Sequence, residues 1–398
     1  MGENILASKR IKVALLSPGA IGETALTHFA TAFAKVMLRE VNLDYISATS
    51  GKYNGIRFKP IIDFRADDYD VVHFQWGNNP LHLFEFSALL KISQRKRRPL
   101  IVSTLHEADL GYLLGASGQA LRYRWYFRFR SGGRTLPKGS SEYEFFSHQT
   151  VAEILKRSDW VIVHSEYAKN RIVSEHSLSV EQSAKIQIAN LGIDWDEYAT
   201  TKESYEEPDR ECRGKPMVFL YVGSLHAIKS VDKIIKGLQL CRHFGRRNDF
   251  YLVIVGFGPE YDTLRELAEA LIPGQYSFAG MVPSLLAYYR LADVVLCPRA
   301  FSRGEISGVI PEACAAGKPV LLPNIGGWGE YIDGSRGFLV AADDELEYAQ
   351  AILYCLENPL GVKERGENAR CFAKNHLSWQ SQTDFFLSLY SGAFRGTC

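Results

Sequence analysis

The strongest constraint on this chain is a repeated alternation of short apolar runs with helix-length stretches. The first run covers residues 11–17 and is followed by a glycine-containing loop and a segment whose apolar residues recur at helical spacing. Further runs read YDVVHFQW, PLIVSTLH, DWVIVHS and KIQIANLG. Runs that are apolar at nearly every position indicate strands buried on both faces of a parallel sheet. The alternation therefore predicts an α/β fold.

A polar, charged stretch divides the chain into two such series. Residues 196–216 show no strand or helix period, which predicts a linker between a domain at 1–195 and a second domain at 217–375. Residues 376–398 are expected to form a helix that packs back towards the first domain. Two Rossmann-like, doubly wound domains in tandem predict a central cleft that faces the carboxyl ends of both sheets, where ligands bind.

Length and charge narrow the classes of function. A chain of 398 residues suits two domains rather than one core. Its formal net charge of +1 gives no general attraction to nucleic acid or anionic lipid, so a charged partner must meet a local patch. We therefore expect no nucleic-acid partner.

Cysteine usage and the amino terminus bear on the cellular location. The seven cysteines are odd in number, lie in the second half and lack C-x-x-C spacing, which argues against disulfides or a zinc knuckle. The first residues lack the pattern of a secretory signal, and no apolar run reaches the roughly 18 residues of a spanning helix. We expect a cytoplasmic protein, with any membrane contact peripheral at the inner face.

Three loops that follow apolar runs carry polar or glycine patterns. Gly19 and Gly22 precede a helix whose free N–H groups favour an anion, or they simply allow a flexible turn. Lys229 lies where another loop enters a helix and can oppose a phosphate, or it is an ordinary surface lysine. The segment VIVGFGPE lacks the third glycine and the acidic residue of a dinucleotide site, so its glycines are expected to permit a tight turn.

The segment GEISGVIPEACAAGKP places two glutamates near the start of a helix. Pro311 is tolerated in a first helical turn, which predicts a helix that begins near Val309. Gly308 then allows close backbone approach to a phosphate. Glu312 can accept hydrogen bonds from two ribose hydroxyls, and Glu305 in the loop is free to reach a second polyol. Alternatively, both glutamates only complement the helix dipole.

In chain order these segments resemble the retaining family-4 glycosyltransferases of GT-B fold, or glycosyltransferase group 1, across nearly the whole length. Three consecutive segments carry the most specific match: LVIVGFGPEYDTLRELA, FAGMVPSLLAYYRLADVVLCP and GEISGVIPEACAAGKPVLLPNIGGWGEYIDGSRGFLV. The segments SPGAIGETALTHFA, TLHEAD, ANLGIDWDEY and YVGSLHAIKSVDKIIKGL also match.

The resemblance implies roles for matching positions around a nucleotide-sugar donor. Lys229 would hold the donor diphosphate, Glu312 the nucleotide ribose and Glu305 the hydroxyls of the donor sugar. His106 would lie near the reacting sugar, which makes His106, Lys229 and Glu305 the catalytic candidates. The other donor-binding positions are Gly19 and Gly22 on the N-domain side of the diphosphate, Met281 and Val282 at the base, and Ser224, Gly308 and Val309.

Two departures from the family pattern concern the same region. Ser224 stands where the family usually has an arginine, so one diphosphate cation is missing or is supplied by Arg299 or Arg303. The paired glutamates of the family are usually separated by seven residues, whereas Glu305 and Glu312 are separated by six.

The expected chemistry needs few side chains. Breaking a sugar–nucleotide bond builds negative charge on the leaving diphosphate, so fixed positive groups supply the largest stabilisation. Lys229 and helix N-termini suit this without a metal or a further cofactor. The resemblance implies that the acceptor attacks from the face that the diphosphate leaves, and that a diphosphate oxygen takes its proton. His73 and His164, inside apolar runs, are predicted to be hydrogen-bonded core histidines.

One segment bears on the acceptor. Residues 119–138 alternate arginines with aromatic residues and contain no acidic residue, which fits a membrane interface or a phosphorylated acceptor. A half-buried element with a solvated basic face would show the same pattern.

The sequence thus predicts a metal-independent, retaining transfer of a hexose-type sugar from a UDP- or GDP-sugar to a glycan, lipid-linked or small-molecule acceptor, as in polysaccharide biosynthesis. A related disaccharide phosphorylase or synthase is an alternative. A catalytically silent homologue that binds a nucleotide sugar is another, suggested by Ser224 and the shortened glutamate spacing.

Overall fold

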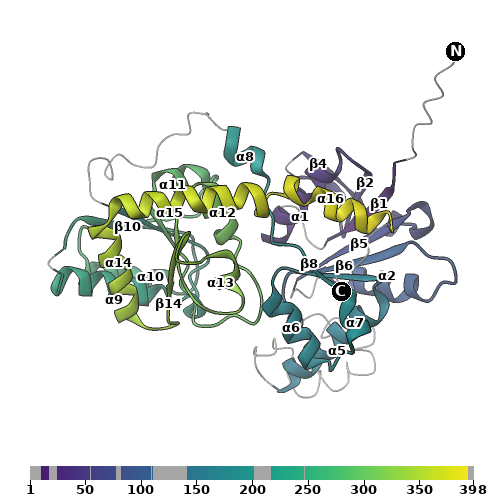
Figure 1. The fold of residues 1–398 in the computed structure, drawn as a ribbon, viewed down its shortest axis with the longest axis horizontal. Helices are drawn as coiled ribbons and strands as arrows, with labels where there is room; N and C mark the ends of the chain where they lie inside the picture. Colours follow the sequence, from purple (N-terminus) through teal and green to yellow (C-terminus); the bar gives the residue numbers. More distant parts are fainter. Residues whose placement is uncertain are drawn as a thin grey trace, which may run out of the picture. The chain divides into compact units, whose positions relative to one another are not determined.

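The computed structural model describes residues 10–17, 25–53, 55–77, 82–108, 110, 141–200, 217–245 and 247–392. Its chain forms two compact units, unit 1 (Met1–Gly192 with Gln382–Cys398) and unit 2 (Ile193–Ser381). Each unit contains a mainly parallel sheet with helices on its faces (Figure 1). The predicted α/β fold is therefore confirmed.

The sheet of unit 1 has eight strands in the order β3-β4-β2-β1-β5-β6-β7-β8. Neighbouring strands pair in parallel, except for the antiparallel pair β3 and β4. All six residues of β5 are buried, as the apolar run predicts for a central strand. The strands are β1 (Lys12–Leu16), β2 (Asn42–Ser47), β3 (Gly51–Tyr53), β4 (Ile56–Pro60), β5 (Val71–Trp76), β6 (Leu100–Leu105), β7 (Trp160–Val163) and β8 (Ile186–Ile188).

Helices cover both faces of this sheet. On one face Phe74 and Trp76 belong to a core that includes Phe86. On the other, Phe33 packs edge-on against Phe386 at 4.7 Å between ring centroids. The helices are α1 (Ala25–Met37), η1 (Ile61–Asp63), η2 (Ala66–Asp68), α2 (Leu83–Ser93), α5 (Ser141–Arg157), α6 (Glu166–Glu175), α7 (Val180–Ala184) and α16 (Trp379–Tyr390), whose last nine residues belong to unit 1.

The sheet of unit 2 has six parallel strands in the order β11-β10-β9-β12-β13-β14. The chain moves outward from β9 to β11 and then returns to place β12 on the other side of β9. In such sheets ligands bind at this switch point, outside the carboxyl ends of the two strands. The strands are β9 (Met217–Val222), β10 (Phe250–Val255), β11 (Tyr276–Gly280), β12 (Val294–Leu296), β13 (Val320–Pro323) and β14 (Gly337–Val340).

The helices of unit 2 enclose a second core, in which α9 packs against both α10 and α14 (Figure 1). They are η5 (Ala227–Lys229), α9 (Val231–His243), α10 (Tyr261–Leu271), α11 (Leu286–Leu291), α12 (Val309–Ala315), α13 (Trp328–Tyr331), α14 (Glu345–Glu357), α15 (Pro359–Phe372) and the π-helix η6 (Ala373–Leu377). The helix predicted to start near Val309 is confirmed.

The start of the predicted linker is helical. Helix α8 (Trp195–Thr200) belongs to unit 2, where it contacts α12. Six residues are fewer than two helical turns, so no repeat of apolar positions could reveal this helix in the sequence.

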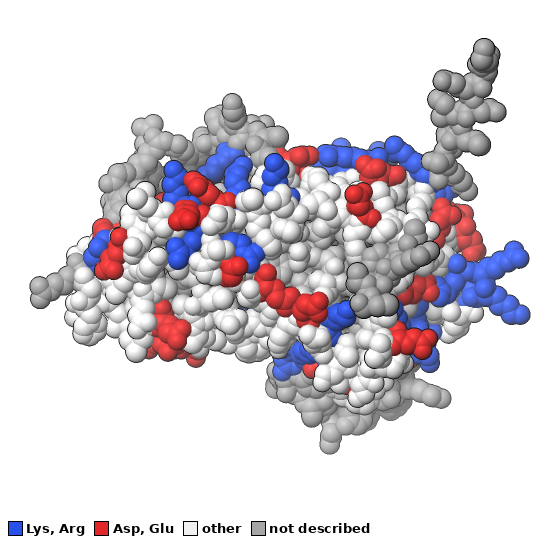
Figure 2. Space-filling view, viewed as in Figure 1, with Lys and Arg blue, Asp and Glu red and all other residues white. Residues whose placement is uncertain are grey.

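The surface agrees with the near-zero net charge. On the face shown in Figure 2, acidic and basic side chains lie interspersed among uncharged ones. In the part of the chain that the structure describes, no helix combines the length and the apolar character needed to cross a membrane.

Candidate functional site

The loop that follows β9 carries Ser224 and Lys229. The hydroxyl of Tyr221 donates to the carbonyl oxygen of Ser224 at 2.9 Å, which fixes the start of the loop. Lys229 ends the short helix η5, and the left-handed Ser230 (φ 49°) then turns the chain into α9. The lysine is therefore placed on the carboxyl-end side of the sheet, beside the switch point.

Glycines allow the next loop to lie directly against this one. A Cβ atom on Gly256 would lie 1.8 Å from the carbonyl oxygen of Gly223, and one on Gly258 would lie 2.4 Å from that of Leu225. The glycines of VGFG thus serve a close approach of two backbone loops, in addition to the turn predicted at Gly256, whose φ is 136°.

The loop after β12 reaches the same place. The N–H of Ala300 donates to the carbonyl oxygen of Ile228 at 3.0 Å, which ties this loop to η5. Cys297 is buried at the start of this loop, where burial raises the pKa of its thiol, and a hydrogen bond with Ser307 and the charge of Lys229 partly offset that rise. The structure therefore brings Lys229 and the loop at 297–307 together, as the resemblance implied.

Glu305 is held by its own loop. Its Oε1 pairs with the guanidinium of Arg299, and its Oε2 accepts hydrogen bonds from the N–H of Arg303 at 2.7 Å and the hydroxyl of Ser302 at 3.0 Å. Its carbonyl oxygen accepts a hydrogen bond from the indole N–H of Trp328 at 2.8 Å. Glu305 is therefore engaged by groups of its own loop rather than free, and its contact with a polyol stays a prediction.

Arg299 was a candidate to replace the missing diphosphate cation. In the structure its guanidinium pairs with Glu305. Both side chains are largely buried, with 12% and 16% of their surface exposed, respectively. A second Arg299 contact is the hydrogen bond from its Nε to the carbonyl oxygen of Phe301 at 2.8 Å. The positive charge of Arg299 is therefore already balanced within the loop.

Glu312 lies in the first turn of α12 and is buried. The hydroxyl of Tyr289, on α11, donates to Glu312 Oε2 at 2.8 Å. Burial, followed by the Glu312 charge, holds the pKa of Tyr289 and of Tyr198 well above the usual range, so both phenols stay protonated. The Tyr289 phenol thus orients the Glu312 carboxylate.

The remaining donor-side positions differ in exposure. Gly308 precedes α12 with helical φ and ψ of −59° and −25°, and no side chain caps the helix there. Met281 follows the edge strand β11 and is 82% exposed, whereas Val282 is half-buried. An exposed methionine at a strand end is available to pack against a planar group.

In unit 1 the structure describes part of the predicted site. His106 follows β6 and is half-buried, whereas Gly19, Gly22 and the segment at 119–138 lie outside the described residues. His73 and His164 are buried and hydrogen-bonded, so their prediction as core histidines is confirmed.

Several side chains near these positions were not singled out in the sequence. Tyr289 and Gln75 lie at buried positions of an apolar helix and an apolar strand, where nothing in the sequence separates them from other core residues. Glu85, in the first turn of α2, is 1% exposed and neither carboxyl oxygen has a hydrogen-bond partner among the described residues. Burial raises its pKa to about 7.

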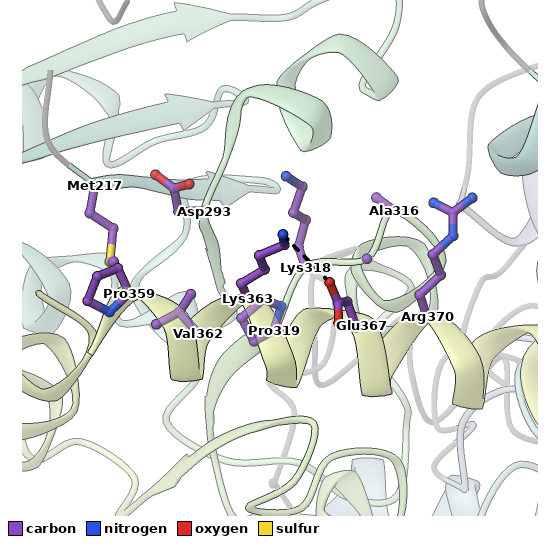
Figure 3. Close-up of a pocket in the computed structure, with 11 residues that line it drawn as sticks. Met217, Asp293, Ala316, Lys318, Pro319, Pro359, Val362, Lys363, Glu367 and Arg370 are labelled. Carbon is purple, nitrogen blue, oxygen red and sulfur yellow. Dashed lines mark ion pairs between the residues drawn. The ribbon is translucent and has the colours of Figure 1, made fainter. Parts of the chain in front are cut away.

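A separate pocket of about 460 Å³ lies where the strands of the unit 2 sheet begin, at their amino ends (Figure 3). Met217, Asp293 and Pro319 line it at or just before the amino ends of β9, β12 and β13. Lys363 and Glu367 of α15 point into it and form an ion pair at 3.9 Å. Since Lys229 and Glu312 follow the carboxyl ends of their strands, this pocket is distinct from the candidate site.

The fold and this arrangement define the class of protein. Unit 2 is a doubly wound α/β unit of the kind that binds nucleotides, and it carries a lysine and a buried glutamate beside its switch point. Residues 216–358 match the family described as glycosyl transferases group 1. Residues 216–358 thus form a glycosyl transferases group 1 segment, and the fold of the chain is the GT-B fold.

Two relatives and one solved structure illustrate the likeness. An uncharacterized glycosyltransferase of Methanocaldococcus jannaschii is 24% identical over 267 residues, which cover 65% of this chain and 66% of the relative. A glycogen synthase of Mycobacterium tuberculosis is 32% identical over 256 residues, or 63% of this chain and 58% of the relative. The chain thus spans less than two thirds of these relatives' length.

The structural likeness extends over almost the whole chain. The crystal structure of Anabaena HepE in complex with UDP and glucose superposes with a TM-score of 0.69 at 16% identity, covering 96% of this chain and 100% of that one. At this identity the comparison establishes the GT-B fold.

Proposed function

We propose that this chain is a retaining glycosyltransferase that moves a hexose-type sugar from a UDP- or GDP-sugar to a glycan, lipid-linked or small-molecule acceptor. The observation that carries the proposal is that the hydrogen bond from Ala300 to Ile228 ties the loop leading into α12 to η5, the short helix that ends at Lys229. That HepE binds UDP and glucose supports a nucleotide-sugar donor.

In the proposed donor site, one charged group binds the diphosphate and other groups recognise the ribose, the sugar and the base. The Lys229 ammonium opposes the diphosphate as a point charge. The Glu312 carboxylate accepts hydrogen bonds from the ribose hydroxyls while the Tyr289 phenol orients it. Main-chain N–H groups at Gly308 and Val309 begin α12 and donate to the sugar or its phosphate, and Met281 with Val282 packs against the base.

Glu305 supports the site by organising the loop. Its three contacts to Arg299, Ser302 and Arg303 close a tight turn that leads directly into Gly308. In this proposal the donor sugar meets the backbone of that turn, and Glu305 reaches a sugar hydroxyl only by sharing the carboxylate oxygens that already accept hydrogen bonds.

The proposed transfer requires no covalent intermediate with a side-chain nucleophile. The bond from the anomeric carbon to the diphosphate oxygen breaks as the acceptor oxygen bonds to that carbon on the same face. The acceptor proton passes to the departing diphosphate oxygen. Lys229 and the N–H groups stabilise the charge that develops on the diphosphate, and this is the largest expected catalytic contribution. His106 would lie near the reacting sugar, as the family resemblance implies.

Calorimetric titration with UDP-, GDP- and ADP-sugars tests the donor assignment. We expect one base series to bind the wild type and Lys229→Ala to lose most of that affinity. Absence of binding by every sugar nucleotide would contradict the proposal. Binding without transfer to any acceptor would favour the catalytically silent homologue, and phosphate-dependent cleavage of a disaccharide would favour the phosphorylase.

A further inference from the structure

A line of hydrogen-bonded side chains crosses unit 1 from its carboxyl-terminal helix to His106. It starts on α16, where the hydroxyl of Tyr390 lies 2.6 Å from Nδ1 of His73. The other ring nitrogen of His73 lies 2.7 Å from the Thr104 hydroxyl and 3.1 Å from the amide group of Gln75, at the atom assigned as its nitrogen. The other end of that amide, assigned as its oxygen, lies 2.6 Å from Nε2 of His106.

The far end of the line fixes the direction of its hydrogen bonds. His164 Nδ1 lies 2.7 Å from the carbonyl oxygen of Ala189, which can only accept, so this nitrogen carries a proton. Burial lowers the pKa of His164 to about 4, which leaves the ring neutral and its Nε2 a hydrogen-bond acceptor. Since His106 Nδ1 lies 3.1 Å from that Nε2, His106 must donate to it.

The same argument then applies to the other nitrogen of His106. Burial holds the pKa of His106 well below its usual range, and positive charge on His164, His73 or His82 would lower it further. A neutral ring with its proton on Nδ1 has a lone pair on Nε2. An amide oxygen 2.6 Å from a lone pair would be repulsive, whereas the amide nitrogen of Gln75 would donate.

The nitrogen and oxygen of a glutamine amide are nearly identical in shape, so the network decides their assignment. With the nitrogen towards His106, the Gln75 oxygen faces His73 Nε2, which donates to it and to Thr104. His73 Nδ1 then accepts from the Tyr390 hydroxyl. Every bond in the line runs in one direction, and each polar group has a partner.

We propose that Gln75 and His164 are positioning residues that hold His106 as the neutral Nδ1–H tautomer, with the Gln75 amide nitrogen donating to His106 Nε2. The proposal rests on the proposed function for its consequence, because His106 matters to transfer only if it adjoins the reacting sugar. Both ring nitrogens are then engaged within unit 1, so His106 meets the sugar only through the face or C–H edge of an uncharged ring and supplies no proton to the leaving group.

Nitrogen-15 NMR of protein labelled at histidine tests the tautomer without any substrate. The His106 resonances are assigned by their loss in His106→Gln. We expect one protonated-type and one unprotonated-type nitrogen near neutral pH, with the proton on Nδ1. Two protonated-type nitrogens, or a proton on Nε2, would overturn the proposal.

The isosteric Gln75→Glu variant tests the part played by Gln75. A carboxylate facing Nε2 must accept a hydrogen bond, so we expect His106 to become doubly protonated at neutral pH. Gln187→Glu is the matched control: Gln187 is also buried in unit 1, but its amide donates to the carbonyl oxygen of Ala184. An unchanged His106 spectrum in folded Gln75→Glu contradicts the proposal.

Kinetics separate positioning from a structural role. Among the described residues, the titratable groups that act on His106 are His164, His73 and His82, with Tyr390 acting through His73. In Gln75→Glu we expect a new ionisation in the kcat profile between about pH 6 and 9, and kcat lowered about tenfold with donor KM within about twofold. If the wild type lacked transferase activity but kept the expected spectrum, the proposed function would fail and the tautomer assignment would stand.

Discussion

The phenol of Tyr289 donates a hydrogen bond to the buried carboxylate of Glu312 at 2.8 Å, joining α11 to the first turn of α12. The two residues flank β12 in the chain, one before the strand and one after it. This contact orients one oxygen of the carboxylate that we assign to the nucleotide ribose. The structure and the sequence together lead to five testable expectations.

Tyr289→Phe should weaken nucleotide binding without unfolding unit 2. A hydrogen bond to a charged group contributes about 1.5 to 3 kcal/mol, so we expect Kd for the nucleotide to rise by about one order of magnitude or more. Calorimetry measures it. Tyr348→Phe is the matched control, because the Tyr348 hydroxyl is buried without a hydrogen-bond partner among the described residues. Equal affinities in the two variants would disprove the orienting role.

Lys229→Ala should reduce donor affinity or turnover by orders of magnitude and leave Tm nearly unchanged. The lysine ends η5 beside the switch point and is half-buried, and in our proposal its charge opposes the donor diphosphate. Lys236→Ala serves as control, since Lys236 pairs with Asp232 one turn away on the exposed side of α9. Wild-type kinetics in Lys229→Ala would discredit the site assignment.

The Arg299–Glu305 pair should contribute to the stability of unit 2. A double-mutant cycle with Arg299→Met, Glu305→Gln and both changes is expected to give a coupling of about 1 to 3 kcal/mol, because the pair is largely buried. The more exposed pair Lys233–Glu345 should couple by less than about 1 kcal/mol. Thermal unfolding reports both cycles, and equal coupling in the two would contradict the role of Glu305 in closing its loop.

Glu85→Gln should remove a pH dependence of stability. Because burial raises the folded-state pKa of Glu85 from 4.5 to about 7, its contribution is fully present below about pH 4.5 and is lost as pH rises through 7. The loss amounts to about 3 kcal/mol, and the neutral amide avoids it. Tm of the variant should exceed that of the wild type at pH 8 but not at pH 5. The exposed Glu181→Gln should show no such crossover.

Neutralising Arg122, Arg124 and Arg128 together should lower sedimentation with anionic vesicles. Arginine binds phosphate and the interleaved aromatic residues suit headgroup depth, so this sequence pattern fits peripheral membrane binding. Neutral vesicles are the control. Sedimentation equal to that of the wild type would favour the alternative of a solvated basic face.

The sequence by itself determined the α/β fold and the residues that follow each strand. Its apolar runs are buried strands because such segments are stable only when covered on both faces, and Pro311 marks the first turn of α12 because its missing N–H costs nothing there. Lys229 and Glu312 could be singled out from the sequence because each lies where a loop after an apolar run enters a predicted helix.

Only the tertiary structure decided which side chains meet. The strand order places the loops after β9 and β12 together, although some 70 residues separate them, and folds Glu305 onto Arg299 instead of leaving it free. The sequence could not reveal the hydrogen bonds of Tyr289 with Glu312 or of Gln75 with His106. A polar residue within an apolar segment shows no sign of its hydrogen-bond partner, because packing of distant segments supplies that partner.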